Sequence, residues 1–300
     1  MLGILSSFAS SCTWAIGTAN YSKLSRKYRP YDVNFARALW TLPCFVIAAL
    51  AAGGIGGFRA FDATNATWLT ISVLASYAIG DTLFLKSTVA LGVPGALAIA
   101  SGYPILTALV GQAYEGQTLR EVQWSGLAVA VTGIVLVILN DPKGTPKEGE
   151  EVRAHPLLRK KSVGVALAIG TALCWTMNGY SIAKGGAGIS AFVANAFRMA
   201  IALPLIATLS FLTDKSRVAW FLDRESRKRY GWVFIVESFF GATFFVYGLT
   251  HTSLVVGNTL SALAPVLSVP VAVALKLEKF SWIRTAAVLT VVVGLSLLFR

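Results

Sequence analysis

The chain has 300 residues and repeats itself at an offset of 161 positions. When residues 3–140 are moved forward by that offset, uncommon residue types meet their own kind: Trp14 meets Trp175, Asn34 meets Asn195, Arg37 meets Arg198, Pro43 meets Pro204, Gly80 meets Gly241 and Pro104 meets Pro265. Agreement of Trp, Asn, Arg and Pro without a gap indicates two copies of one unit. We therefore expect a first repeat over 1–140, a linker over 141–161 and a second repeat over 162–300.

The composition indicates that both copies lie in a lipid bilayer. Hydrophobic residues make up 55% of the chain and charged residues 13%, whereas soluble proteins have about 25% charged residues. A helix needs about 20 mostly apolar residues to span the hydrocarbon. Ten stretches meet this requirement: 3–22, 34–52, 67–90, 93–113, 122–140, 162–182, 189–212, 231–250, 254–275 and 281–299. The sequence thus predicts an all-α membrane protein with ten transmembrane helices, five in each repeat.

The positive charges are concentrated on one side of this predicted topology. The net charge is +12, but Lys and Arg are located mainly in the connections, which favours an anionic membrane surface as partner over nucleic acid. Of the 26 Lys and Arg residues, 20 belong to the connections after the odd-numbered spans or to the span ends beside them, and 4 belong to the opposite side. Because positive connections stay in the cytoplasm, this distribution places both chain ends outside.

The charge pattern also agrees with a duplication that inverts its second copy. A unit of five spans ends on the opposite side of the membrane, so its copy must insert upside down. The connection after the first span has four basic residues, and its copy keeps only Lys184. Conversely, the connection that contains Arg59 has a copy with six basic residues. We therefore predict two inverted five-helix repeats.

Several short motifs resemble one known family. They are CTW at 12–14, CW at 174–175, NFAR at 34–37, NAFR at 195–198, YP at 103–104 and AP at 264–265. The chain resembles the EamA-like branch of the drug/metabolite transporter superfamily. The resemblance implies a secondary transporter of a bacterial inner (plasma) membrane, often an exporter of amino acids or other small metabolites. It also implies a central cavity lined by spans 1, 3 and 4 and their copies. Many relatives keep their ends in the cytoplasm, so the orientation stays open.

Polar and aromatic residues within the spans are the candidates for substrate binding. Trp14 and Trp175 lie midway along their spans rather than in the interfacial belt where Trp is common, and each shares a helical face with polar residues. Such a face suits a small amphipathic solute, although core filling is the alternative. The predicted substrate-binding residues are Trp14, Tyr77, Tyr103, Trp175, Asn178, Tyr247 and Asn258.

Two acidic residues within the spans are the candidates for ion coupling. A carboxylate in hydrocarbon costs at least about 2.5 kcal/mol and seldom occurs there without a function. Asp81 lies in the third span and Glu237 in the eighth. Removal from water favours the protonated form unless a cation lies close, so either acid could exchange a proton. The alternatives are an ion pair of Asp81 with Lys86 or Arg37, and contact of Glu237 with the membrane interface.

Two other features repeat in both halves. Arg37 and Arg198 lie three to four residues into their spans, which predicts that each side chain reaches the interface as an anchor. Pro104 and Pro265 each remove one helical hydrogen bond. A kink beside a cavity and a bend that only fits neighbouring helices explain these prolines equally well.

Other chemistries have no support in the sequence. Three Cys lie inside spans and two His lie at span ends or in connections, so no metal site is predicted. The phosphate-binding GxxxxGK[ST] motif is absent, so we expect neither ATP nor another cofactor. We also expect no enzyme activity. We predict a transporter that works by alternating access on a small-molecule substrate with a proton or counter-solute. The alternative is a non-transporting receptor or assembly partner with the same fold.

Overall fold

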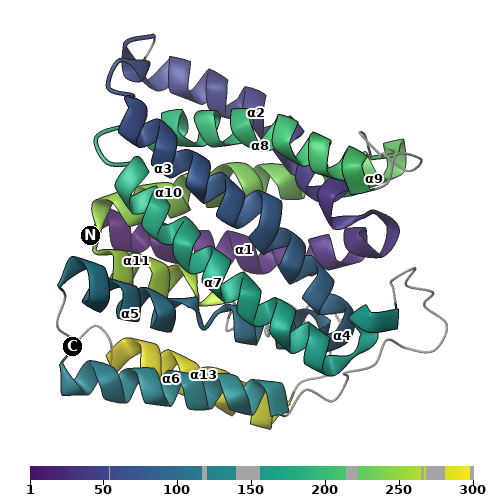
Figure 1. The fold of residues 1–300 in the computed structure, drawn as a ribbon, viewed down its shortest axis with the longest axis vertical. Coiled ribbons are helices and arrows are strands. Elements are labelled where there is room, and N and C mark those ends of the chain that lie inside the picture. The colour runs from purple at the N-terminus through teal and green to yellow at the C-terminus, as the bar shows by residue number, and fades with distance from the viewer. Residues whose placement is uncertain are drawn as a thin grey trace.

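The computed structural model describes residues 1–53, 55–116, 120–139, 156–213, 222–264, 267 and 281–297, and every regular element in these residues is a helix. Figure 1 shows the arrangement. The α-helices are α1 (Leu2–Lys27), α2 (Pro30–Gly53), α3 (Ala63–Val73), α4 (Asp81–Ala100), α5 (Tyr103–Glu115), α6 (Glu121–Leu139), α7 (Lys161–Gly185), α8 (Ala191–Thr213), α9 (Arg224–Val233), α10 (Ala242–His251), α11 (Leu254–Ser261) and α13 (Trp282–Leu297). Two π-helical segments, η2 (Leu74–Gly80) and η5 (Phe234–Gly241), and two 3₁₀ turns, η1 (Ile55–Phe58) and η3 (Pro156–Arg159), join them.

Within the described residues, six helical segments are long and apolar enough to cross a membrane. They are Tyr31–Gly53, Ala63–Gly92, Gly95–Tyr114, Lys161–Gly185, Ala191–Leu212 and Arg224–His251, and two shorter apolar helices cover Leu2–Gly17 and Trp282–Leu297. Large apolar side chains such as Ile47 and Leu173 are 67% and 56% exposed on these helices. An extensively apolar outer surface is typical of a protein that faces lipid. Most of the predicted linker over 141–161, the motif residue Pro265 and much of the predicted ninth span lie outside the described residues.

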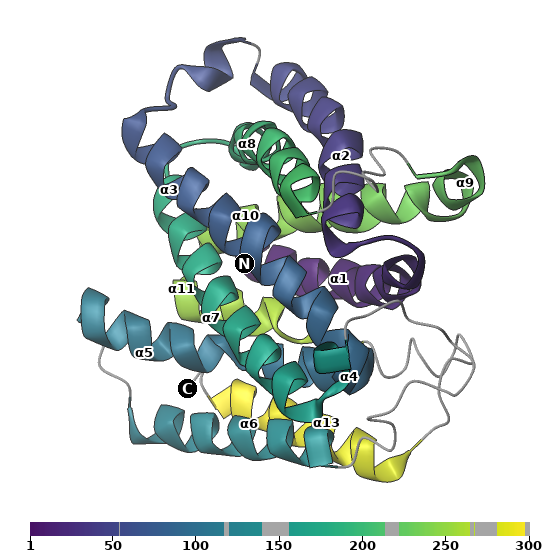
Figure 2. The ribbon, with the colours of Figure 1, turned by 45° about the vertical axis from the view of Figure 1, so that its right-hand side comes forward.

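Helices of one half pack on helices of the other. In both views α2 lies beside α8 at one edge of the molecule, and α6 lies beside α13 at the opposite edge (Figures 1 and 2). Between these pairs, α1 packs against η5 and α10, whereas α7 packs against η2 and α4. Each of these contacts has its counterpart at the offset of 161 positions. The two halves therefore share one interior.

Glycines at equivalent positions bring these helices close together. A Cβ on Gly133 of α6 would lie 2.7 Å from Val291 of α13, and a Cβ on Gly294 of α13 would lie 2.3 Å from the Ala130 nitrogen of α6. Both the two glycines and the two residues they meet are 161 positions apart. Only a residue without a side chain allows such an approach of the backbones.

The helices of the third and eighth predicted spans change their winding at equivalent places. Segments η2 and η5 both have π geometry, which adds a residue to one helical turn and often occurs at functional sites. Farther along, α4 contains Gly92 with a φ of 68°, which few other residues adopt. Next, α4 ends at Ala100 and α5 begins at Tyr103, with Pro104 in its first turn. One helix therefore ends before Pro104 and another begins there, instead of a single kinked helix. Because Pro104 lies in the first turn of α5, it removes no helical hydrogen bond.

The C-terminal ends of α1 and α7 are held by different kinds of contact. At the end of α1, the Lys27 Nζ donates to the Asp223 carboxylate at 2.6 Å, and the Tyr28 hydroxyl donates to the same group. These hydrogen bonds, that of Lys27 first, lower the pKa of Asp223. At the end of α7, the Asn65 amide donates to the carbonyl of Gly185 at 2.9 Å. Asp223 caps the start of α9, and Asn65 lies in the first turn of α3, which Asp62 caps. The two helix starts are equivalent in the repeat, so both contacts come from equivalent places.

Candidate functional site

A cavity of about 100 Å³ lies between the two halves, where the two π-helical segments and the break before α5 meet α1 and α7. A single water needs roughly 10–15 Å³, so the cavity has room for several waters or a small solute. Its lining residues are Ser10, Thr13, Trp14, Arg37, Ser76, Tyr77, Asp81, Ser101, Tyr103, Trp175, Asn178, Arg198, Glu237, Gly241, Ala242, Phe245 and Ser261. The lining thus combines aromatic, hydroxyl, amide and charged groups from both repeats.

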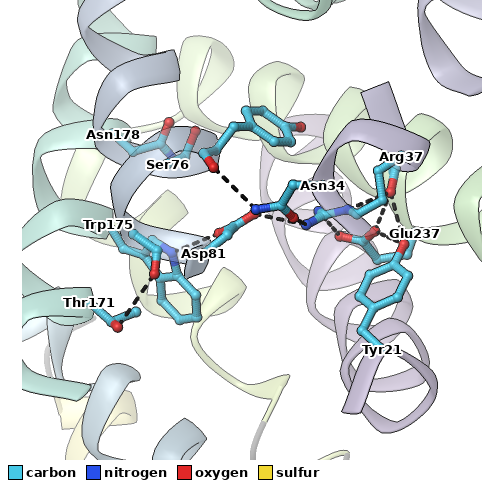
Figure 3. A network of polar contacts seen from close by, with 12 residues as sticks. Tyr21, Asn34, Arg37, Ser76, Asp81, Thr171, Trp175, Asn178 and Glu237 are labelled. Carbon is cyan, nitrogen blue, oxygen red and sulfur yellow. Dashed lines mark hydrogen bonds and ion pairs between the residues drawn. The ribbon is translucent and has the colours of Figure 1, made fainter. Parts of the chain in front are cut away.

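Arg37 binds two carboxylates at one side of this cavity (Figure 3). Its Nη1 lies 2.8 Å from the Asp81 Oδ2, and its Nη2 lies 3.0 Å from the Glu237 Oε1. All three residues are at most 5% exposed. We call Arg37, Asp81 and Glu237 the charged triad. The prediction that Arg37 anchors the chain at the interface is wrong, because the buried acids need a cation more than the lipid surface does.

Polar neighbours complete the shell around the charged triad. The Tyr21 hydroxyl donates to the Glu237 carboxylate, as does the Ser238 hydroxyl. On the other acid, the Trp175 Nε1 donates to Asp81 Oδ1 at 3.2 Å. These bonds, several of them drawn in Figure 3, leave both carboxylates engaged from two directions. With both acids ionised, the charged triad has a formal charge of −1.

Arg198 occupies the equivalent place in the second half but has neutral partners. It is 2% exposed, so its predicted role as an interface anchor is also wrong. Its Nη2 donates to the Asn178 Oδ1 at 3.0 Å, its Nη1 to the Asn195 Oδ1 at 3.0 Å and its Nε to the Ser72 Oγ at 2.9 Å. A longer contact of 3.4 Å joins Nη2 to the Ser76 Oγ. Among the described residues, no carboxylate lies within ion-pair distance of this guanidinium.

The repeat explains this difference between the two arginines. At the offset of 161 positions, Glu237 aligns with Ser76 and Asp81 aligns with Ala242. The acids that bind Arg37 are therefore replaced by a hydroxyl and a methyl group beside Arg198. The two halves place equivalent cations at the cavity but provide carboxylates to only one of them.

Aromatic rings form the apolar wall of the cavity. The ring centroids of Trp14 and Trp175 lie 5.5 Å apart in an edge-to-face arrangement, and those of Tyr103 and Trp175 lie 6.0 Å apart. The Tyr103 hydroxyl turns away to donate to the backbone carbonyl of Asn258 at 3.0 Å. Both guanidinium groups lie near the Tyr77 ring, at 5.4 Å for Arg37 and 5.5 Å for Arg198. The lining therefore suits a solute in which an apolar group lies next to a charged one.

The structure brings most of the sequence-predicted site residues to this one cavity. The lining includes Trp14, Tyr77, Asp81, Tyr103, Trp175, Asn178 and Glu237. Tyr247 and Asn258 are not part of it. Tyr247 stacks on His251 with ring centroids 3.9 Å apart, and the Asn258 side chain lies against Gly179 and donates to Thr107.

Sequence reasoning missed the two arginines and Ser76 as site residues. The sequence contains a signal for Arg37, since two acids within hydrocarbon require a cation and Arg37 is one of the partners expected for Asp81. No such signal exists for Ser76, which is important only because it stands where the other half has Glu237. Within the described part of the chain, no group of three His, Cys, Asp or Glu side chains could hold a metal ion.

Comparison with known proteins agrees with this architecture. The family model for the EamA-like transporter family matches residues 1–139 and again residues 162–300. The chain belongs to the EamA-like transporter family. This match confirms the resemblance to the drug/metabolite transporter superfamily. Together with the apolar helices, it makes the chain a multi-pass integral membrane protein of a transporter family.

A solved crystal structure has the same fold as this EamA-like protein. It is 16% identical in sequence, its TM-score is 0.72, and the match covers 99% of this chain and 98% of that one. At this identity the likeness shows the fold alone. No curated protein matches the sequence.

Proposed function

We propose that this EamA-like protein is a secondary transporter in which two inverted five-helix repeats, ten spans in all, move around the cavity between them. The proposed substrates are amino acids or other small metabolites, and the proposed direction is export. Alternating access in such repeats is a rearrangement of one half against the other around a fixed central site.

The position of the cavity supports this proposal. Residues of both halves line it, and its charged triad joins α2 and α4 of the first half to η5 of the second. A relative movement of the halves must therefore change the contacts of Arg37. A receptor that only binds a ligand does not require a buried ion pair such as Arg37–Glu237 to join two moving halves.

The charged triad also supports coupling to protons. Its formal charge is −1, and a buried excess charge is costly. One proton on Asp81 or Glu237 neutralises the triad while Arg37 keeps the other acid as partner. Proton binding can thus accompany a change in the position of Arg37, which is the linkage that a proton-driven transporter needs.

The test is flux in reconstituted vesicles. Purified protein in liposomes is given a panel of amino acids, amines and nucleobases, with and without an imposed pH gradient. We expect at least one solute to move faster than through protein-free vesicles and to respond to the gradient. Specific binding without movement of any bound solute would instead favour a receptor.

A further inference from the structure

Arg198 is a buried charge at the cavity that the proposed coupling mechanism does not use. Its guanidinium lines the cavity, is 2% exposed and has only hydroxyl and amide acceptors around it. A guanidinium has five N–H donors and always retains its charge. The four contacts described above leave one of these donors without an acceptor among the described residues.

No carboxylate among the described residues pairs directly with the Arg198 guanidinium. Transfer of an ion into a protein interior is costly, and contact with an aromatic ring such as that of Tyr77 offsets only part of this cost. The negative groups of the charged triad are already bound to Arg37, at 2.8 and 3.0 Å. An additional anion within the cavity would provide the missing partner.

We infer that Arg198, with Asn178 and Ser76, is the subsite of the cavity that binds a carboxylate of the substrate. This inference rests on the proposed function, and it narrows the substrates to small carboxylates, including amino acids. The aromatic wall of Trp14, Trp175 and Tyr103 receives the apolar part of the same molecule.

The geometry favours a carboxylate over a phosphate. A carboxylate carries one charge and can accept a charge-assisted hydrogen bond from the one Arg198 N–H that the described contacts leave over. A doubly charged phosphate would need a second cation, and Arg37 is already bound to two acids. Those acids would also repel the second charge of a phosphate.

The repeat itself supplies a precise way to block the subsite. In the first half, Glu237 reaches Arg37 because Gly17 leaves room for it: a Cβ on Gly17 would lie 2.4 Å from the Glu237 Cγ. The equivalent positions beside Arg198 hold Ser76 and Asn178. The double substitution Ser76→Glu with Asn178→Gly copies the first arrangement and gives Arg198 a permanent carboxylate.

Binding is measured as a thermal shift of the purified protein in detergent. The probes are acetate, 4-methylpentanoate, phenylacetate and L-leucine, each beside its amide, together with isoamylamine and inorganic phosphate. We expect at least one acid to raise the melting temperature of the wild type, its amide to require at least a tenfold higher concentration, and phosphate to have no effect. The double variant should be at least as stable as the wild type without ligand and should lose the response to that acid at least tenfold.

Two further variants keep the result interpretable. Ser190→Asp adds a carboxylate outside the cavity at the start of α8, where Ser190 accepts the Val193 N–H and Asp is an equally good cap. It should respond like the wild type. If the double variant does not fold, Arg198→Lys keeps the charge but loses the fork, and should weaken the response to the acid.

Several outcomes would overturn the inference. They are a response to amides, isoamylamine or phosphate as strong as that to the acids, an unchanged response in the double variant, or no response to any acid. Acid binding that depends on Arg198, without flux in vesicles, would leave the subsite standing and remove the transport proposal. Flux of a solute without a carboxylate would do the reverse.

Discussion

The Glu237 side chain lies in the space that a side chain at Gly17 would fill. A Cβ on Gly17 would approach the Glu237 Cγ to 2.4 Å and its Cβ to 2.9 Å. These atoms are close to the η5 backbone and cannot simply turn aside. The position of one acid of the charged triad is thus set by a glycine on a helix of the other repeat.

Replacement of this glycine should disturb the charged triad. We expect Gly17→Ala to displace Glu237 from Arg37, to lower the melting temperature by several degrees and to reduce flux. Overpacking of this kind typically costs about 1–3 kcal/mol. Gly53→Ala is the matched control, because a Cβ there meets no atom within 4 Å. Equal melting temperatures for the two variants would show that the close approach is unimportant.

Removal of Arg37 should destabilise the protein more than removal of any exposed cation. Arg37→Met leaves Asp81 and Glu237 buried without a partner, and loss of one member of a buried ion pair costs about 3–5 kcal/mol. The measurement is thermal unfolding in detergent, with Arg59→Met at an exposed position as control. Addition of Asp81→Asn and Glu237→Gln to Arg37→Met should restore part of the stability. A triple variant less stable than the single one would contradict this explanation.

The coupling role of Asp81 can be separated from binding. We expect Asp81→Asn to lower flux driven by a pH gradient at least tenfold while solute exchange without a gradient stays measurable. The amide can still accept from the Trp175 N–H but cannot exchange a proton. Glu237→Gln is made in parallel, since the two acids have similar contacts with Arg37. Driven flux at the wild-type level would remove Asp81 from the mechanism.

The contact at the end of α1 should depend on pH in a defined direction. Hydrogen bonds from Lys27, Tyr28 and Ser226 hold the pKa of Asp223 below its usual value near 3.9. A depressed pKa means that the stabilisation is complete above that value and is lost as the pH falls below it. The Lys27 pKa is raised by its hydrogen bond to Asp223, so this half of the contact is lost only as the pH rises above about 10.4.

Asp223→Asn isolates this effect because Asn is still a good helix cap. We expect the melting temperatures of the wild type and the variant to differ between about pH 5 and pH 9 and to converge below about pH 4. Asp62→Asn at the equivalent helix start serves as control and should show a smaller change with pH. A difference that grows with acidification would mean that the ion pair does not stabilise the fold.

The distribution of basic residues predicts the orientation. It places the end that contains Lys27 and Asp223 in the cytoplasm and the end that contains Asn65 and Ser190 outside. In a protein without its native cysteines, Ser190→Cys should react with a membrane-impermeant maleimide in intact cells, and Glu225→Cys only after permeabilisation. The opposite labelling pattern would match the orientation that is common among relatives.

Much of the fold could be predicted from the sequence because the repeat and the apolar stretches are both encoded by residue types along the chain. The six long apolar segments begin or end within a few residues of predicted spans. The π geometry of η2 and η5 could not be predicted, since an added residue in one turn leaves no mark in hydropathy. The helix break before Tyr103 could not be predicted either, because a proline is compatible with a kink, with a bend and with the first turn of a new helix.

The candidate site was predictable by type of residue but not by partner. Trp14, Trp175 and both acids stood out because their chemistry is unusual within a membrane. The partners of Arg37 did not, because Glu237 is separated from it by 200 positions and only packing of the two halves brings them together. Asn258 is the opposite case, because it has a residue type that suits a binding site but lies outside the cavity. A polar group in a span can have no other role than to hold two helices together.

The two contacts that hold the C-terminal ends of α1 and α7 also differ in their exposure to solvent. The Lys27 and Asp223 side chains are 61% and 40% exposed, so dissolved ions reach this pair and weaken it. The amide of Asn65 is buried against carbonyl groups and has no charge to screen. Ionic strength therefore acts on the ion pair at the end of α1 but not on the contact of Asn65. In the proposed transporter, the salt content of the compartment at the α1 end would decide how readily the protein opens toward that compartment.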